Sequence, residues 1–353
     1  MKYLQDSINL KDKKVLLRVD FNVSLEKGKI KDKFKIEAAK ESLDFLLDQG
    51  AKVAMLSHFG RPTHNVSHNE AGRLEGFQKE FSLSQIQNEV ADILGREIVF
   101  VPDCLGEKVS QALDDNNLLL LENVRFYSGE EENSEEFAKK LSENFDIFVN
   151  DAFSVCHRNQ ASVTGVTKFL ESYAGRNLQK EVVELSHIRK DFARPAVAVI
   201  GGAKIETKLP VINFFKDIYD FVLVGGKVAN EALDSKEDFG EKVLLPVDFV
   251  DDRLDIGSDT IARFKKIIEE AKTIVWNGPM GKFEEERYAS GTEEIYQAIV
   301  ENQEAVKVTG GGETLEILEK KNSFDKFTFV STGGGAMLEY ITKGTLPGLE
   351  VLK

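Results

Sequence analysis

Several features that define large classes of protein are missing from this sequence. No apolar run approaches the roughly 18 residues of a membrane-spanning helix, and the first ten residues include Asp6 where a signal peptide would be apolar. Cysteine is scarce: Cys104 and Cys156 are the only two, and their spacing fits neither a metal site nor a redox pair. We therefore expect a cytoplasmic protein with reduced cysteines.

Positive charge is also in short supply. The 353 residues include 46 Lys and Arg against 60 Asp and Glu, which gives a formal net charge of −14. This charge disfavours general affinity for nucleic acid or membranes, so we expect neither as a partner. Small anions remain possible ligands, because a local arginine cluster acts at shorter range than the global field. The acidic run at 129–136 (GEEENSEE) is expected to be a solvated loop and helix start.

Two familiar nucleotide-binding motifs are absent as well. The chain contains no G-x-x-x-x-G-K-[ST] loop, and no G-x-G-x-x-G follows a predicted strand. The first absence excludes a Walker-type nucleotide site. The second absence weakens the hypothesis of a nicotinamide-dependent dehydrogenase. A protein that does not bind NADH would exclude that hypothesis.

The second half of the chain repeats one pattern, in which an apolar run ends in glycines and a helical pattern follows at once. It occurs at 196–209, 221–233, 273–286, 305–318 and 327–341. Strands that alternate with helices predict a parallel sheet. Each turn would place backbone N–H groups and a helix N-terminus at the carboxyl edge of that sheet, where anions bind. The pattern predicts a polyphosphate site built from backbone.

Apolar runs in the first half end instead in acid, amide and arginine. Strands are predicted at 14–21, 52–57, 98–101, 118–122 and 146–149, and helices at 36–49, 82–94, 106–113 and 134–144. An exposed loop is expected over 63–78, and one connecting helix over 172–191.

The expected fold is therefore α/β, with two doubly wound, mainly parallel-sheet (Rossmann-like) domains joined by a helix hinge. We place a domain that holds a small anion at 1–172, with a C-terminal return at 342–353, and a domain that holds polyphosphate at 173–341.

Three arginines, Arg61, Arg125 and Arg158, each follow a predicted strand end. Guanidinium groups match carboxylate and phosphate with two parallel hydrogen bonds. One such arginine is usually part of a surface ion pair, but three at the same sheet edge indicate an anion site.

Other polar residues follow the same strands. Asp20 and Asn22 could accept a hydrogen bond from a substrate hydroxyl and orient it. For His58 and His157, a structural hydrogen bond and a ligand contact remain equally open.

In the second half, Lys204 and Lys208 lie four residues apart, directly after a glycine turn. On a helix start they share one face, directed at whatever the glycines bind. Glu313 and Thr314 follow another glycine turn, where they could cap a helix or, in the case of Glu313, hold Mg²⁺ against phosphates.

Longer strings identify a family. RVDFNV, SHFGRP, LLENVRF, VNDAFSVCHR, GGAKIETKL, VWNGPMGKFE, GGGET and VSTGGGAMLE follow one another over nearly the whole chain. In this order they make the sequence resemble 3-phosphoglycerate kinases. The resemblance implies a monomer that transfers a phosphoryl group reversibly from 1,3-bisphosphoglycerate to MgADP, giving 3-phosphoglycerate and MgATP, with two domains that close about a hinge.

The resemblance also implies roles for individual residues. Those implied to bind phosphoglycerate are Asp20, Asn22, Lys35, His58, Arg61, Arg125 and Arg158. Those implied to bind ATP or ADP are Gly202, Lys204, Lys208, Gly225, Asn277, Glu284, Gly311, Gly312, Glu313 and Thr314. Lys208, Lys35, Gly334 and Gly335 would act on the phosphoryl group in transfer, and Glu313 would hold Mg²⁺.

This chain departs from the family pattern in four ways. Lys35 stands where the family has arginine, Glu313 where it has aspartate, and Lys227 where it has the third glycine of a turn. The segment between that turn and residue 245 is also short, which leaves the choice between ATP and GTP open. Because of these departures a second hypothesis stays open, namely a kinase-shaped protein that binds ligands with weak or no turnover.

Overall fold

The computed structural model spans residues 1–353 and describes all of them except 6–7, 63–66, 69–73, 204 and 236–237. Backbone contacts divide the chain into unit 1, Met1–Val182 with Thr345–Lys353, and unit 2, Val183–Gly344. The border at 172/173 expected from the sequence lies before this division. No helix in the described ranges combines the length and the apolar character of a membrane span.

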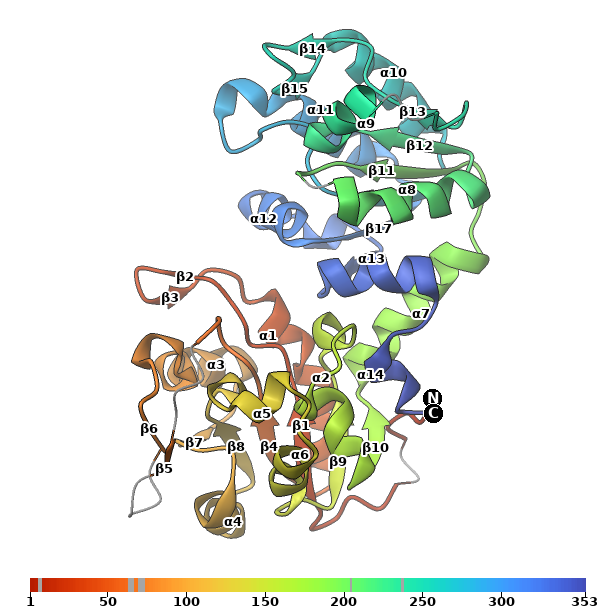
Figure 1. Ribbon diagram of the computed structural model, residues 1–353. Coiled ribbons are helices and arrows are strands. Elements are labelled where there is room, and N and C mark those ends of the chain that lie inside the picture. Colours follow the sequence, from red (N-terminus) through yellow and green to blue (C-terminus); the bar gives the residue numbers. More distant parts are fainter. Residues whose placement is uncertain (6–7, 63–66, 69–73, 204, 236–237) are drawn as a thin grey trace. The chain divides into compact units, whose positions relative to one another are not determined.

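Unit 1 is built on a six-stranded sheet with the strand order β10-β9-β1-β4-β8-β7 (Figure 1). Every pairing in this sheet is parallel. In chain order the strands are β1 (Lys14–Arg18), β4 (Lys52–Leu56), β7 (Val99–Val101), β8 (Leu118–Leu121), β9 (Ile147–Asn150) and β10 (Glu171–Ala174). The apolar runs of β8 and β9 are buried throughout, as in a parallel sheet that is covered on both faces.

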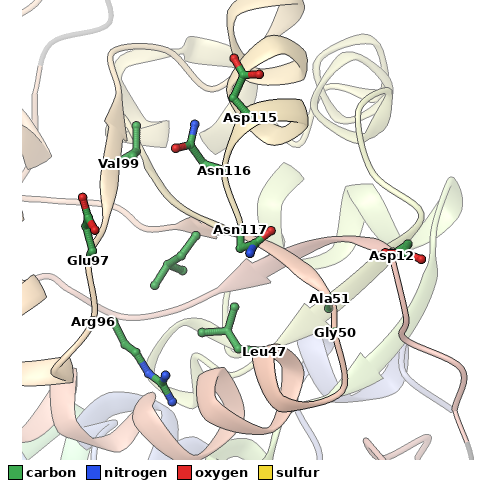
Figure 2. A pocket seen from close by; sticks show the side chains of 11 residues that line it. Asp12, Leu47, Gly50, Ala51, Arg96, Glu97, Val99, Asp115, Asn116 and Asn117 are labelled. Atoms are coloured by element: carbon green, nitrogen blue, oxygen red, sulfur yellow. The ribbon is translucent and has the colours of Figure 1, made fainter.

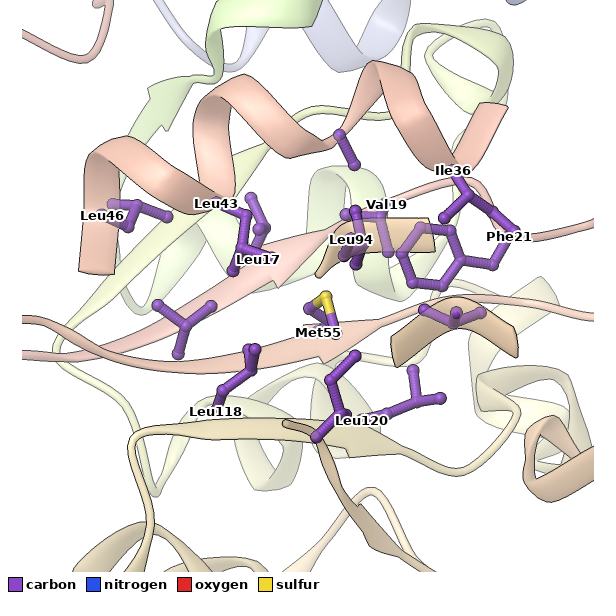
Figure 3. Packing of buried hydrophobic residues seen from close by; sticks show 14 of the residues in the cluster. Leu17, Val19, Phe21, Ile36, Leu43, Leu46, Met55, Leu94, Leu118 and Leu120 are labelled. Atoms are coloured by element: carbon purple, nitrogen blue, oxygen red, sulfur yellow. The ribbon is translucent and has the colours of Figure 1, made fainter. Parts of the chain in front are cut away.

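Helices cover both faces of this sheet. Successive side chains of a strand point to opposite faces, so Leu17 and Met55 belong to one core and Leu16 and Ala54 to the other. The first core includes residues of α1 (Phe34–Ala38), α2 (Lys40–Asp48) and α3 (Gln87–Leu94), as Figure 3 shows. The second includes residues of α4 (Gly106–Asp115) and α6 (Glu135–Ser142).

A single helix was predicted over 172–191, and the prediction was wrong for the first residues of this range. Residues Glu171–Ala174 form β10, whose Ser172 pairs with Phe148 of β9. The helix α7 (Arg176–Lys190) begins only after Gly175. A Cβ atom at Gly175 would lie 2.2 Å from the Asp151 carboxylate, so there is no room for a side chain between the strand and the helix.

Two smaller differences concern unit 1, and one expectation cannot be compared. The helix expected over 36–49 is divided into α1 and α2 at Ala39. Most of the loop expected over 63–78 lies outside the described residues. Glu130, in the run expected to be solvated, is fully buried in α5 (Ser128–Glu131).

Unit 2 repeats the architecture with the strand order β13-β12-β11-β16-β17-β18, again parallel throughout. The strands are β11 (Ala196–Ile200), β12 (Phe221–Val224), β13 (Val243–Leu244), β16 (Thr273–Asn277), β17 (Val306–Gly310) and β18 (Phe329–Ser331). The helices are α8 (Ile205–Ile218), α9 (Gly226–Ser235), α10 (Ser258–Glu270), α11 (Ser290–Glu301), α12 (Gly312–Lys321) and α13 (Gly334–Lys343).

Four of the five glycine patterns form a strand, a turn and a helix as predicted. The fifth does not, because β16 is followed by an irregular segment and the next helix, α11, begins only at Ser290. Gly278 has a φ of +96° and Pro279 follows it, a combination that leads the chain away from a helix.

The last residues of the chain belong to unit 1. Helix α14 (Pro347–Glu350) begins with a proline at its first turn. The Gly348 N–H donates to the Cys156 carbonyl at 2.8 Å, and the Lys2 N–H donates to the Leu352 carbonyl at 2.6 Å.

Candidate active site

The carboxyl edge of the unit 1 sheet gathers the polar residues that the sequence places after its strands. Asp20 and Asn22 follow β1, His58 and Arg61 follow β4, Arg125 follows β8, and Arg158 follows β9. Because β9, β1, β4 and β8 are parallel neighbours, these four strand ends lie side by side.

Asp20 is the centre of this group. One of its carboxylate oxygens accepts hydrogen bonds from Lys35 Nζ at 2.9 Å and from Ser154 Oγ at 2.5 Å. The other accepts from the Asn22 N–H at 3.0 Å. Burial alone would raise the pKa of Asp20, but the positive charge of Lys35 and these hydrogen bonds hold it well below its ordinary value. Asp20 is therefore an ionised anchor that positions Lys35.

Arg158 is near both Asp20 and Arg61, and Arg125 contacts the residue that precedes Arg61. Arg125 donates from Nη1 to the carbonyl of Gly60 at 2.7 Å, next to Arg61. Burial lowers the pKa of the half-buried Arg158, and the charge of Arg61 lowers it further, while Asp20 raises it. Arg61 itself is exposed. The edge thus carries a local excess of positive charge in an otherwise acidic protein.

Asn123 and Ser154 shape the site but were missed in the sequence. The fully buried Asn123 accepts from the Phe59 and Arg125 N–H groups at 3.1 and 3.0 Å and donates to the Phe59 carbonyl at 2.7 Å. It therefore ties the loop before Arg61 to the loop that carries Arg125. Both residues lie within the strings LLENVRF and VNDAFSVCHR, so the motifs contained the signal.

The carboxyl edge of the unit 2 sheet is crowded with backbone. A side chain at Gly201 would meet the Pro279 carbonyl at 2.0 Å, and one at Gly334 would meet the Gly311 Cα at 2.6 Å. Gly202 and Gly311 have φ values of +95° and +108°, which favour glycine. These turns bring the first residues of α8, α9, α12 and α13 close together, and their N–H groups and helix dipoles favour an anion.

Lys208, in the first turns of α8, lies among these glycines. Its Nζ donates to Asn277 Oδ1, and the Asn277 amide donates to the Gly310 carbonyl. Burial lowers the pKa of Lys208 to about 8, although Glu313 raises it. Burial likewise raises the pKa of Glu313, which Lys208 opposes. The two charged groups face each other across Gly202, whose added side chain would lie 2.9 Å from the Glu313 carboxylate.

A pocket of about 380 Å³ opens beside these residues. It is lined by Gly202, Ala203, Gly226, Lys227, Asn230, Arg253, Leu254, Pro279, Gly281, Lys282, Glu284 and Glu313. Three of the predicted nucleotide-binding residues are among them: Gly202, Glu284 and Glu313. Lys227 at its rim is exposed, and its Nζ lies 3.6 Å from Glu231. Such a pocket is of the size that small-molecule sites have.

The other residues of unit 2 that were predicted to bind the nucleotide or to act on the transferred group surround the same turns. Gly225 precedes α9, and its N–H donates to the Ile200 carbonyl at 3.0 Å. Gly312 and Gly334 begin α12 and α13, Gly335 follows in α13, and the buried Thr314 accepts from the Gly278 N–H at 2.9 Å. Lys204 lies outside the described residues.

A separate depression of about 590 Å³ lies at the opposite, amino edge of the unit 1 sheet, away from the arginines. Its polar side chains, including Glu97, Asp115 and Asn116, do not converge on one point (Figure 2). Arg96 is already bound to Asp44 through Nε and Nη2 at 3.1 and 2.7 Å. We therefore place no site there.

The donor set of unit 2 suits a magnesium ion that arrives with a nucleotide. Among the described residues, no group of three or more His, Cys, Asp or Glu side chains could hold a metal by itself. Mg²⁺ is usually bound by one or two carboxylates together with waters and substrate phosphates. The carboxylate of Glu313, beside the helix N-termini and lining the pocket, fits that role.

A sheet edge rich in arginine in one unit, and glycine-lined turns around a half-buried lysine in the other, are features that favour a phosphotransferase. The sequence profile of the phosphoglycerate kinases matches residues 5–246 and 235–344. Since these matches extend over nearly the whole sequence, the chain belongs to the phosphoglycerate kinase family. The resemblance, fold class and kinase activity predicted from the sequence are thereby confirmed.

Relatives and solved structures agree. The phosphoglycerate kinase of Borreliella burgdorferi is 35% identical over 402 residues, covering 100% of this chain and 99% of the relative. That of Dictyoglomus turgidum is 36% identical over 394 residues, covering 98% and 96%. The phosphoglycerate kinase structures from Coxiella burnetii and Pyrococcus horikoshii have TM-scores of 0.80 and 0.84. The Coxiella burnetii structure is 34% identical in sequence, and the match covers 99% of this chain and 98% of that one. The Pyrococcus horikoshii structure is 29% identical, and the match covers 100% of this chain and 98% of that one.

The relatives also contain residues that this chain lacks. The first alignment extends over 402 positions, although the chain has only 353 residues. The two profile matches overlap at 235–246. In this region the sequence is shorter than the family pattern.

Proposed function

We propose that unit 1 binds phosphoglycerate and unit 2 binds the magnesium nucleotide, and that the protein transfers the phosphoryl group from one of these ligands to the other. The arginine, lysine and histidine side chains around Asp20 support the first assignment. The crowded glycine turns around Lys208 support the second, and this second arrangement is the observation that carries the proposal. The domain limits expected from the sequence for these roles, 1–172 with 342–353 and 173–341, stay a prediction, whereas the two units divide after Val182 and after Gly344.

The chemistry requires no general base. The attacking oxygen belongs to a carboxylate in one direction and to the ADP phosphate in the other, and both are already ionised. The protein must then align the reactants and neutralise the charge spread over the transferred group. Lys208 and the N–H groups at the starts of α12 and α13 supply that neutralisation in unit 2. Bound Mg²⁺, held by Glu313 and the nucleotide phosphates, would add positive charge there.

Unit 1 contributes orientation. Arg61, Arg125 and Arg158 would bind the phosphate that is not transferred, with His58 as a further donor. Asp20 and Asn22 would hold the region of the glycerate hydroxyl. Lys35, positioned by Asp20, would approach the transferred group.

We further propose a cytoplasmic monomer that uses ATP or ADP and binds neither nucleic acid nor membrane. The net charge of −14 supports the last point.

A coupled assay tests the proposed function. The purified protein is given ATP, Mg²⁺ and 3-phosphoglycerate, and the product is followed through NADH oxidation by a coupled dehydrogenase, with GTP in a parallel series. We expect turnover that needs both substrates and Mg²⁺. Binding of both ligands by calorimetry without turnover would support the ligand-binding alternative instead.

The first variant tests Lys35. Replacing it by arginine is expected to raise kcat about fivefold, since the planar guanidinium can keep the Asp20 contact and add a second oriented donor worth about 1 kcal/mol. Lys33→Arg, at an exposed position just before the same helix, is the control. An unchanged or lower kcat in Lys35→Arg would count against the assigned role.

The second variant tests Glu313. In Glu313→Gln, the Mg²⁺ concentration that gives half-maximal activity is expected to rise about tenfold or more, because one charged ligand worth about 1.5–3 kcal/mol is lost. Glu313→Asp should stay close to the wild type. Glu316→Gln removes the same charge one turn along α12 and should leave the Mg²⁺ requirement unchanged. Equal shifts in the two glutamine variants would reject Glu313 as the ligand.

The third prediction concerns pH. Since burial lowers the pKa of Lys208 to about 8, the free protein loses this positive charge as the pH rises through 8. The Kd for MgATP should therefore rise by up to about tenfold for each pH unit above that value. Calorimetry at pH 7, 8 and 9 measures this, and Lys208→Arg should flatten the profile because a guanidinium stays charged. A wild-type Kd independent of pH would contradict the prediction.

A further inference from the structure

A line of buried polar residues runs behind His58, within unit 1. Arg18 at the end of β1, Glu130 of α5 and Ser162 are all fully buried. Charged side chains in a protein interior are costly unless they are paired and hydrogen-bonded. None of the three belongs to the predicted site, so their burial calls for an explanation.

The direction of each hydrogen bond in this line follows from a charged Arg18 and an ionised Glu130. Burial raises the pKa of Glu130, but the charge of Arg18 and the hydrogen bonds from Ser162 oppose that rise. The Ser162 N–H and Oγ–H both donate to the Glu130 carboxylate, at 2.8 and 2.6 Å. A serine hydroxyl has one hydrogen, so Ser162 Oγ can only accept from Arg18 Nε, which lies 3.0 Å away. The line therefore runs from Arg18 as donor through Ser162 to Glu130 as final acceptor.

The other end of Arg18 meets His58. Arg18 Nη2 lies 3.3 Å from His58 Nδ1, and Arg18 Nη1 donates to the carbonyls of Val19 and Leu56. A guanidinium group has donors only, so His58 Nδ1 must be the acceptor and cannot carry a hydrogen. The neutral ring then has its hydrogen on Nε2.

The carboxylate near His58 does not reverse this assignment. Asp20 lies 4.0 Å from His58 Nδ1, beyond hydrogen-bond distance, and its oxygens already accept from Asn22, Lys35 and Ser154. Burial, together with the charges of Arg18, Arg158 and Lys35, lowers the pKa of His58 to about 3, although Asp20 raises it. His58 is therefore neutral near pH 7.

We propose that Glu130 is a positioning residue which, through Ser162 and Arg18, fixes His58 as the tautomer with its hydrogen on Nε2. Glu130 orients Ser162, and Ser162 offers its lone pair to Arg18 Nε. This contact holds the guanidinium with Nη2 against the histidine. His58 would then give phosphoglycerate a single neutral N–H donor, while the arginines supply the positive charge. Only this last step rests on the proposed function.

The ¹⁵N chemical shifts of the histidine ring nitrogens test the tautomer directly. The protein contains five histidines, and His58→Gln assigns the signals of His58. In the wild type we expect a neutral ring between pH 5 and 8, with a hydrogen on Nε2 and none on Nδ1. A ring protonated at pH 7, or one with its hydrogen on Nδ1, would overturn the proposal.

Variants test the role of Glu130. In Glu130→Gln and in Ser162→Ala we expect mixed His58 tautomers and a KM for 3-phosphoglycerate raised about fivefold, with a smaller change in kcat. Glu130→Asp should restore part of the wild-type ratio, and Glu132→Gln, at an exposed neighbour, should change neither quantity. A wild-type tautomer ratio in folded Ser162→Ala would overturn the proposal, even if Glu130→Gln does not fold. Wild-type protein with the expected tautomer but no turnover would contradict only the proposed function.

Discussion

Lys208→Ala is expected to lower kcat by about a thousandfold in the coupled assay, while the KM for 3-phosphoglycerate stays nearly unchanged. Lys208 is half-buried among the glycine turns, where water screens its charge poorly. Charge develops on the transferred phosphoryl group, and removing one preorganised donor at such a place costs about 10²–10³ in kcat. Loss of a full positive charge should place the variant at the upper end of that range.

The control for this variant lies on the same helix. Lys216→Ala removes the same charge near the far end of α8, away from the turns. We expect it to keep kcat within about twofold and to leave the thermal midpoint close to that of Lys208→Ala, since neither change alters the sheet. If both variants lost activity equally, a general effect of charge or of helix stability would explain the result and the role of Lys208 would be refuted.

Much of the fold could be predicted because parallel strands covered on both faces become continuous apolar runs. β8 is LLLL and β11 is AVAVI, and both are fully buried. β10 could not be recognised, because its ESYA sequence is short, half polar and joined to a helix by a single glycine. Its identity as a strand depends on pairing with β9, a contact that local sequence does not encode.

The same distinction applies to the site. Arg61, Arg125 and Arg158 could be found because charged side chains directly after apolar runs are conspicuous. Glu130 could not, since it lies in an acidic run that is typical of a solvated loop. Only the fold brings Ser162, 32 residues further along, to its carboxylate. Residues that contact a ligand are thus more visible in a sequence than those that hold them in place.

Arg61→Ala should raise the KM for 3-phosphoglycerate about a hundredfold and leave the KM for ATP unchanged. Two charge-assisted hydrogen bonds to one phosphate are together worth about 3 kcal/mol, which corresponds to roughly that factor. The KM of Arg61→Lys for 3-phosphoglycerate should lie between those of the wild type and of Arg61→Ala, because lysine keeps the charge but loses the planar group. The thermal midpoint should hardly change, since Arg61 is exposed.

Arg96→Ala is the matched control, because it removes an arginine at the other edge of the same sheet. Its pair with Asp44 is a surface contact screened by water and contributes little, so both KM values should stay at wild type. The double variant Arg61→Ala with Arg158→Ala gives a sharper test. The charge of Arg61 lowers the pKa of Arg158, so the two guanidinium groups are near enough to influence each other. If both bind one phosphate, the combined rise in KM should differ from the product of the single effects, because each arginine changes the field in which the other binds. A wild-type KM for 3-phosphoglycerate in Arg158→Ala would contradict a phosphate shared by the two arginines.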